Sequence, residues 1–410
     1  MIGAARSVRL SRSPKAEHGI WARQEARLLS DAISLRRHDM EILGGERAMP
    51  DSVRGGQRRF ALPVAAVVVN LAAWCARGRA IQRLPEPDKD ALAHLDIAER
   101  LLAQPFRLNL HWVWLPGYHY YLAALFSLGT RPEAIRFINA GLAAVLASLL
   151  FGYARARSGH SAVPWLAALF CAVAPIVNLM GISAQQETLF SILVLACAWA
   201  IEARRVLTAG LVLAAAAMVR YEAWGAVGVI TALGAAQYWP ALARRLPRFA
   251  RGPNQLLRVA APALIAIFGW LFVQRLASGK WFGTLHELYR FTKNQRHVLS
   301  HGTWMDLLWF PVILPLSLFG LALPFAFLGL KRTWNTGFLV PAGIAAFLML
   351  SYTSKGSLGS GRYFDALAPF VCLCAAEGIV QLCKQRPAAL VWLSGATTVC
   401  MAVLAVCLIR

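Results

Sequence analysis

The sequence predicts an all-α polytopic membrane protein, a bundle of about eleven transmembrane helices. Hydrophobic residues make up 58% of the 410 residues and charged residues only 15%, against about 25% charged residues in soluble domains. The mean hydropathy is +0.51. The apolar residues also come in blocks long enough to cross lipid. These observations exclude a soluble globular enzyme, a coiled coil and a mainly disordered chain.

The first 59 residues differ from the rest. They mix Arg, Ser, Asp and Glu and contain no apolar run of spanning length, nor the apolar core of a signal peptide. We expect residues 1–59 to form a basic, poorly ordered cytoplasmic tail and residues 60–410 to form the membrane domain. The eight cysteines lie almost entirely in apolar blocks. They are expected to be packing residues, because none has the partners of a zinc site.

The predicted transmembrane helices follow from apolar blocks separated by short polar gaps. These blocks are 60–76, 136–154, 162–180, 187–201, 206–219, 223–239, 259–273, 307–329, 338–351, 364–382 and 389–409.

The basic residues predict the orientation of these helices. Lys and Arg number 42 against 20 Asp and Glu, a net charge of +22. In a soluble protein this excess would suggest nucleic-acid binding, but here the basic residues lie in short gaps between apolar blocks, as on the cytoplasmic side of membrane proteins. We therefore expect a multi-pass protein of the inner (plasma) membrane with a cytoplasmic N-terminus. The cytoplasmic gaps contain Arg58-Arg59, Arg155/Arg157, Arg204-Arg205, Arg244-Arg245, Lys331-Arg332 and Lys384/Arg386.

Alternation from these gaps puts five segments on the outer side: 77–111, 185–187, 220–222, 274–305 and 352–363. The apolar, aromatic-rich stretch 112–129 does not fit as a crossing, since one more crossing would put Glu187 on the cytoplasmic side. Its Trp and Tyr residues suit the membrane interface. It is therefore predicted to be a re-entrant or interfacial helix.

Ionisable side chains near membrane depth are functional candidates because burying them is costly. Carboxylates there could act as bases or hold a metal, and Arg or Lys could hold an anion. Four outer-side segments carry such groups. They are the first loop with Glu86, Asp88, Asp90, His94, Asp96 and Glu99, followed by Trp114 and His119; Gln185-Gln186-Glu187; Arg220-Tyr221-Glu222; and the stretch from Lys355 to Arg362-Tyr363.

Structural explanations stand beside these functional ones. Asp88, Asp96 and Glu99 are expected to be solvated charges, and Asp96 has helix spacing to Arg100. Glu187 would also be favoured as a first-turn acid by the helix dipole. Arg220 and Glu222 are two residues apart and would not face each other on a helix, but a helix break there would let both point into a cavity. Lys355 could be an anchor whose ammonium reaches the interface.

At these residues the chain resembles the GT-C membrane glycosyltransferases, in particular the bacterial branch related to protein O-mannosyltransferases and aminoarabinose transferases. The resemblance covers about residues 60–380. The matching segments run in order, all on the outer side. They are Asp90-Ala-Leu-Ala-His94-Leu-Asp-Ile-Ala98, Trp114-Leu-Pro-Gly-Tyr-His119, Glu187-Thr-Leu-Phe, Arg220-Tyr221-Glu222-Ala-Trp224, and Arg362-Tyr363 with Pro369.

The resemblance implies a GT-C-like bundle that transfers a sugar from a polyprenyl-phosphate donor to an acceptor hydroxyl on the outer face, with inversion. Asp90 would be the general base. The resemblance further implies that Glu187 and Glu222 position the acceptor, orient neighbouring groups or, with Asp90, hold a divalent metal ion. The residues that would contact the donor or its phosphate are His94, His119, Arg220, Lys355, Arg362 and Tyr363, and those that would contact substrate are Trp114 and Tyr221.

Two departures from the family pattern are visible. Family members often continue beyond the last span, and their second acidic position is often Asp, where this chain has Glu187. The alternative function is a multi-span transporter or lipid flippase, which would also contain buried charges. Transporters tend to show internal repeats with sites at the midplane, whereas here no repeat is visible and the polar groups gather towards one face. Trp114 remains open between stacking on a sugar and anchoring in the interface.

Overall fold

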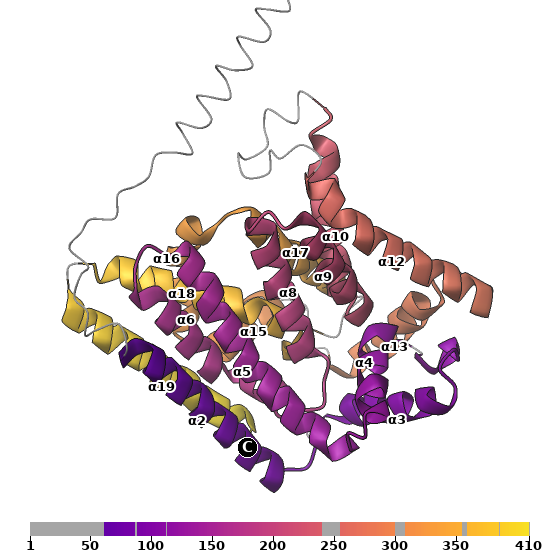
Figure 1. Ribbon diagram of the computed structural model, residues 1–410, viewed down its shortest axis with the longest axis horizontal. Coiled ribbons are helices and arrows are strands. Elements are labelled where there is room, and N and C mark those ends of the chain that lie inside the picture. The colour runs from indigo at the N-terminus through magenta and orange to yellow at the C-terminus, as the bar shows by residue number, and fades with distance from the viewer. Residues whose placement is uncertain are drawn as a thin grey trace, which may run out of the picture. The chain divides into compact units, whose positions relative to one another are not determined.

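The computed structural model describes residues 61–86, 88–111, 113–239, 255–299, 308–354, 359–384 and 386–409. These residues form a helical bundle, with no β-strand among them (Figure 1). Each predicted span coincides with helical structure over its described part. The predicted tail, residues 1–59, and Lys355 lie outside the described residues.

Five described segments are long and apolar enough to cross a membrane, or seven if two bent pairs each count as one span. The five are α5 (Pro132–Arg157), α12 (Gln255–Ser278), Thr336–Thr353 containing α17 (Leu339–Thr353), Gly361–Leu382 containing α18 (Ala368–Leu382), and α19 (Pro387–Ile409). The predicted span at 60–76 is α2 (Ala61–Arg83).

The spans predicted at 162–180 and 307–329 are bent rather than straight. The first divides into α6 (Ala162–Val173) and α7 (Pro175–Gly181), which meet at 54°. Pro175 lacks a backbone N–H, and the Asn178 amide donates to the Ala172 and Ala174 carbonyls at 3.1 and 2.9 Å. The second divides at 102° into Trp309–Phe319 and α16 (Ala322–Thr333), and Gly320 between them has φ of 50°, which glycine adopts without strain.

Three helices that contribute to the candidate site are short. They are α8 (Glu187–Glu202), α9 (Val206–Val219) and α10 (Glu222–Ala236), of 16, 14 and 15 residues. At 1.5 Å per residue they extend about 21–24 Å, less than the ~30 Å thickness of a hydrocarbon core. Their polar ends therefore lie within the thickness of the bundle, where side chains from several helices can meet.

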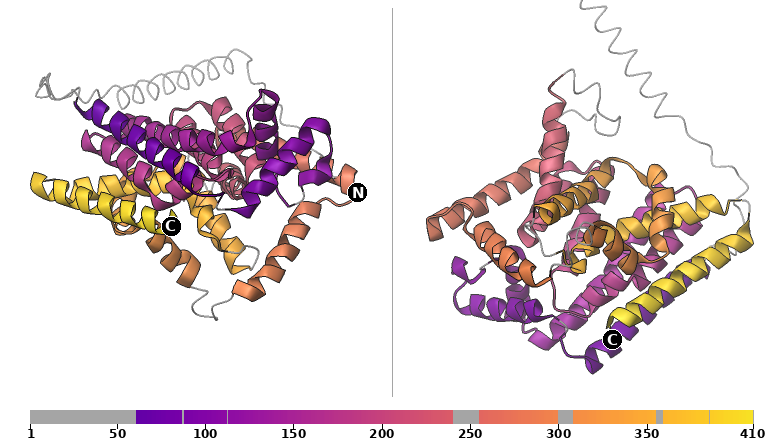
Figure 2. Two further views of the ribbon diagram at one scale, coloured as in Figure 1. Left: turned by 90° about the horizontal axis from the view of Figure 1, so that it is seen from below. Right: turned by 180° about the vertical axis from the view of Figure 1, so that it is seen from behind.

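The first outer loop folds into α3 (Lys89–Ala103), the 3₁₀ turn η2 (Leu108–His111) and α4 (Pro116–Ser127), and α3 packs on α4. With 12 residues, α4 is too short to cross lipid, which agrees with the predicted interfacial helix at 112–129. The predicted outer loop 274–305 contains a further helix, α13 (Gly283–Leu299), next to the end of α12 (Figure 2).

A partly buried ion pair and its hydrogen bonds join three helices at the end predicted to face the cytoplasm. Arg157 at the end of α5 lies 3.0 Å from the Glu202 carboxylate at the end of α8 and also donates to the Thr333 carbonyl in α16. The Tyr153 hydroxyl donates to the same carboxylate. These contacts fix the end of the bundle away from the outer-side polar residues.

Glycine allows α16 and α18 to pack backbone to backbone. A Cβ built on Gly329 would lie 1.9 Å from the Cys374 carbonyl oxygen, and one on Gly378 would lie 2.0 Å from the Phe325 oxygen. Small residues at helix crossings permit this close approach in membrane proteins.

Gly329→Ala is expected to lower the free energy of unfolding by about 1–3 kcal/mol, because the two helices must separate to admit the methyl group. The comparison is Gly395→Ala in α19, where nothing lies within 4 Å of the new Cβ. The midpoint of thermal unfolding of the purified protein is the measurement. Equal midpoints for the two variants would contradict the close packing of α16 on α18.

Candidate active site

Arg220 lies between two carboxylates at a helix break. Helix α9 ends at Val219, Arg220 has extended backbone angles of −145° and 143°, and α10 begins at Glu222. This break turns Arg220 and Glu222 towards each other. The Arg220 Nε and Nη2 donate to the two Glu222 oxygens at 3.0 and 2.6 Å, while Nη1 donates to Glu187, the first residue of α8. All three residues are buried, so this ion triad is shielded from water.

Arg362, in the 3₁₀ turn η6 (Gly361–Leu367), joins this triad to the first outer loop. Its Nη2 donates to Asp90 Oδ2 at 2.7 Å and its Nη1 to Asp88 Oδ2 at 3.1 Å. Its Nε lies 3.7 Å from Glu187 Oε1. The expectation that Asp88 is a solvated charge is therefore wrong. The other oxygen of Asp88 caps α3 by accepting from the Asp90 N–H at 2.9 Å, which fixes both carboxylates beside Arg362.

We call these six side chains the acid–arginine cluster: Asp88, Asp90, Glu187, Glu222, Arg220 and Arg362. Four carboxylates face two guanidinium groups, and the Tyr363 ring contacts both guanidiniums, at 5.2 and 5.8 Å. The structure thus brings together the three predicted catalytic acids, Asp90, Glu187 and Glu222. It also brings to them three of the residues predicted to contact the donor or its phosphate, Arg220, Arg362 and Tyr363. Within the cluster, the Arg362 Nε–H and Glu187 Oε2 are buried without a hydrogen-bond partner, so a donor and an acceptor remain unused at its centre.

A chain of three buried histidines lies beside the cluster. His94 Nδ1 is 2.8 Å from His119 Nε2, and His119 Nδ1 is 2.8 Å from His111 Nδ1. Burial lowers the pKa of His111 to about 4; burial and then His111 lower that of His119 to about 3. The pKa of His94 is lowered well below its usual value, by burial first and then by His119 and Arg362. All three rings are therefore neutral at neutral pH.

Trp114 packs on this histidine chain, with its ring centroid 4.7 Å from that of His94. Trp114 is half-buried in this position. The predicted substrate residue Tyr221 lies one residue from both Arg220 and Glu222, and its hydroxyl donates to Thr284 Oγ1 in α13 at 3.1 Å. Burial raises the pKa of Tyr221 to about 12, so the hydroxyl keeps its proton at neutral pH.

Three buried polar residues near the cluster were not predicted. His111 was missed because nothing in its spacing reveals the 3₁₀ turn that brings it to His119. Asp365 is 1% exposed and accepts from the Ser191 hydroxyl at 2.7 Å. Arg77 in α2 is 2% exposed and donates to Asn178 and to the Ala172 carbonyl. Asp365 could have been found, since it is an ionisable residue within the predicted apolar segment 364–382, whereas Arg77 is the first residue of the predicted outer loop 77–111.

The described residues contain no group of three or more His, Cys, Asp or Glu side chains that could hold a metal ion. Of the three residues considered for a metal, Asp90 and Glu187 contact Arg362, and Glu222 contacts Arg220. The arrangement therefore does not fit a metal site, and its chemistry is that of carboxylates and guanidiniums.

No protein-family model and no curated protein sequence matches the chain. Among solved structures, the fold is similar to that of ArnT from Cupriavidus metallidurans, crystallised bound to undecaprenyl phosphate, with a TM-score of 0.54 and 15% sequence identity. The similarity covers 84% of this chain but 63% of ArnT. It confirms the predicted GT-C-like bundle of helices.

Proposed function

We propose that the chain is an integral-membrane glycosyltransferase that moves a sugar from a polyprenyl-phosphate donor to an acceptor hydroxyl on the outer face of the inner (plasma) membrane. The acid–arginine cluster carries this proposal. It combines carboxylates able to accept a proton with guanidiniums able to hold a phosphate, and charge bias alone assigns all its segments to one side of the membrane. The similarity in fold to a protein crystallised with undecaprenyl phosphate supports the choice of donor.

Asp90 is proposed as the general base. Its side chain is 37% exposed, the most accessible of the carboxylates bonded to Arg362 or Arg220, so an acceptor can reach it. The acceptor hydroxyl would give its proton to Asp90 while its oxygen bonds to the anomeric carbon. The bond from that carbon to the phosphate oxygen breaks, and the electron pair leaves with the polyprenyl phosphate. Attack opposite to the leaving group inverts the anomeric configuration.

Arg362 is better placed than Arg220 to hold the phosphate. Arg220 uses all three guanidinium nitrogens on Glu187 and Glu222, so its proposed role is to fix those two carboxylates in place. Arg362 has an unused Nε–H. A phosphate that bonds to Arg362 would also compete with Asp90 for the guanidinium and so free the base. His94, whose Nε2 has no partner, would contact the donor beside it, with Trp114 against its ring.

The direct test incubates the purified protein with a panel of polyprenyl-phosphate sugars, with and without a chelator, and follows donor consumption and polyprenyl-phosphate release. Consumption of one donor supports the transferase. Movement of the intact donor between leaflets of a vesicle, without consumption, would replace it with the flippase alternative.

Arg362→Ala is expected to weaken donor binding about 10- to 100-fold, the value of a charge-assisted hydrogen bond of about 1.5–3 kcal/mol. The matched control is Arg100→Ala on α3, whose ion pair with Asp96 is exposed and which should leave donor affinity unchanged. Donor affinity is measured by titrating the purified protein with the consumed donor. Unchanged affinity in Arg362→Ala would remove Arg362 from phosphate binding.

A further inference from the structure

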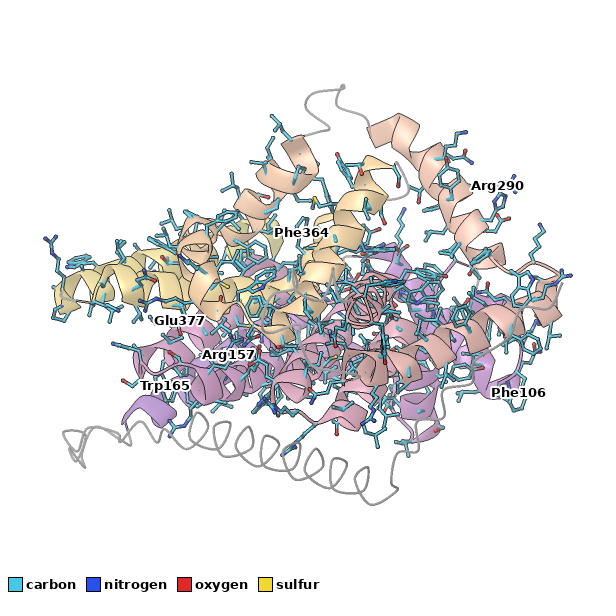
Figure 3. The ribbon with its side chains drawn as sticks, turned by 90° about the horizontal axis from the view of Figure 1, so that it is seen from above. Phe106, Arg157, Trp165, Arg290, Phe364 and Glu377 are labelled. Carbon is cyan, nitrogen blue, oxygen red and sulfur yellow. The ribbon has the colours of Figure 1, made fainter. Side chains whose placement is uncertain are left out.

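A cavity of about 270 Å³ lies between the end of α12 and the start of α13. Its polar lining comes from Trp270, Gln274, Ser278, Lys280, Thr284 and Glu287. We propose that this cavity is a carbohydrate-binding subsite that holds one sugar ring beside the acid–arginine cluster. The inference rests on the proposed transferase function, for which it supplies a place to hold a sugar. In Figure 3, Arg290 of α13 lies well away from Phe364 of η6, so α13 extends outwards from the interior of the bundle.

The side chains around the cavity include one hydrogen-bond donor and one acceptor that have no partner. Gln274 is 5% exposed, and its Nε2 donates to Thr284 Oγ1 at 2.6 Å while its Oε1 has no partner. The Tyr221 hydroxyl bonds to the same Thr284 oxygen at 3.1 Å. Each hydroxyl carries one hydrogen, and the single bond between the two hydroxyls uses only one of their two hydrogens. One hydroxyl hydrogen therefore remains to be donated.

Trp270 adds a second unused donor to the same cavity. It is 7% exposed, and its buried Nε1–H has no hydrogen-bond partner. Leaving buried polar groups unpaired costs about 1–3 kcal/mol each, so a ligand that forms hydrogen bonds with them recovers part of that free energy. A sugar hydroxyl both donates and accepts, and a ring with several hydroxyls can meet two donors and one acceptor together.

The charge and the size of the cavity favour a neutral ligand with one ring. Lys280 and Glu287 are both in the lining, so the opposite charges favour neither an anion nor a cation. A volume of about 270 Å³ corresponds to about nine waters at ~30 Å³ each, which suits one sugar ring and is too small for a folded partner.

Two chains of contacts connect the cavity to the proposed chemistry. Through Thr284 it reaches Tyr221, the residue between Arg220 and Glu222. Through Trp270 it reaches His111, whose ring centroid is 5.7 Å from the Trp270 ring, and hence His119 and His94. A sugar held here would therefore lie close to Tyr221 and His111, which in turn adjoin residues assigned to the transfer step.

The test measures sugar binding directly, without a known acceptor. The protein is placed in lipid nanodiscs, because glycoside detergents would occupy the subsite. Saturation-transfer NMR is recorded with the methyl glycosides of glucose, galactose and mannose as probes. Gln274→Met and Trp270→Phe are each expected to weaken probe binding about 5-fold, for one lost hydrogen bond of about 1 kcal/mol. The matched controls, Gln255→Met at the other end of α12 and Trp392→Phe, 78% exposed on α19, should bind as the unmodified protein does.

Ala277→Phe tests the subsite without altering a buried polar group. Ala277 lines the cavity and is exposed, so a ring there fills the cavity from outside and should abolish probe binding while thermal unfolding is unchanged. Probe binding that survives Ala277→Phe, or no probe binding by the unmodified protein, would overturn the inference.

Adding the polyprenyl-phosphate sugar shows whether the subsite holds the sugar of the donor or a sugar of the acceptor. Loss of the probe signal on saturation with donor assigns the subsite to the donor sugar, and simultaneous binding assigns it to the acceptor; both support a carbohydrate subsite. Donor consumption on the same preparation separates the two proposals. If the protein consumes donor but binds no probe, only the subsite is overturned. If the unmodified protein binds the probe, Gln274→Met does not, and no donor is consumed, only the transferase is overturned.

Discussion

Asp90→Asn is expected to lower the rate of donor consumption by about 10²- to 10⁴-fold, the usual contribution of a general base. The amide has the same shape and keeps an oxygen that can accept from Arg362, but it cannot take a proton from the acceptor hydroxyl. Initial rates at saturating donor are the measurement. Because donor binding depends on Arg362, the donor KM should change far less than kcat.

The structure supplies two comparisons for Asp90→Asn. Asp96→Asn lies on the same helix, with a side chain 54% exposed and paired only with Arg100 among the ion pairs of the described residues. It should retain full activity. Asp88→Asn keeps the cap of α3, since Asn caps as well as Asp, and should lower activity far less than Asp90→Asn. A large loss in Asp88→Asn with near-normal rates in Asp90→Asn would transfer the role of base to Asp88.

Arg220→Met is expected to destabilise the protein by about 3–5 kcal/mol, the usual result of removing one partner from a buried ion pair. Glu187 and Glu222 would then face each other without the guanidinium that now separates them. Unfolding in denaturant, followed by near-ultraviolet circular dichroism, is the measurement. Arg100→Met breaks an exposed pair and should cost at most about 1 kcal/mol.

Neutralising the unpaired Glu187 and Glu222 carboxylates should restore most of the stability lost in Arg220→Met. The triple variant Arg220→Met, Glu187→Gln, Glu222→Gln keeps the side-chain volumes and leaves no uncompensated charge, so its unfolding midpoint should approach that of the unmodified protein. It should have no transferase activity. An Arg220→Met variant as stable as Arg100→Met would show that the buried triad contributes little to the fold.

The sequence predicts the positions of the helices well, because a lipid-crossing helix is defined by its local composition. It also predicts which polar segments share a side of the membrane, since the charge of each gap is local too. The helix break at Arg220-Tyr221-Glu222 is also visible in the sequence, as a polar gap between two apolar blocks. The extended backbone at Arg220 forms this break, and Arg220 and Glu222 meet there.

What the sequence does not reveal are partners that come from far away in the chain. Asp88 was expected to be a solvated loop or helix-surface charge, but its partner Arg362 lies 274 residues later. Gln274 and Thr284 lie in a segment predicted to be a loop, and only the fold of α13 brings them to Tyr221. The bend at Gly320 depends on a backbone conformation that a lone glycine permits but does not require.

The three linked histidines have one further consequence. A neutral imidazole carries a proton on only one nitrogen, and His119 uses both of its nitrogens on neighbouring rings. It must therefore donate to one neighbour and accept from the other, so all three tautomers change together. If His111 donates to His119, His94 carries its hydrogen on Nε2; if His111 accepts, His94 Nε2 carries none. A single hydrogen bond formed at His111 thus decides whether His94 Nε2 donates or accepts a hydrogen bond.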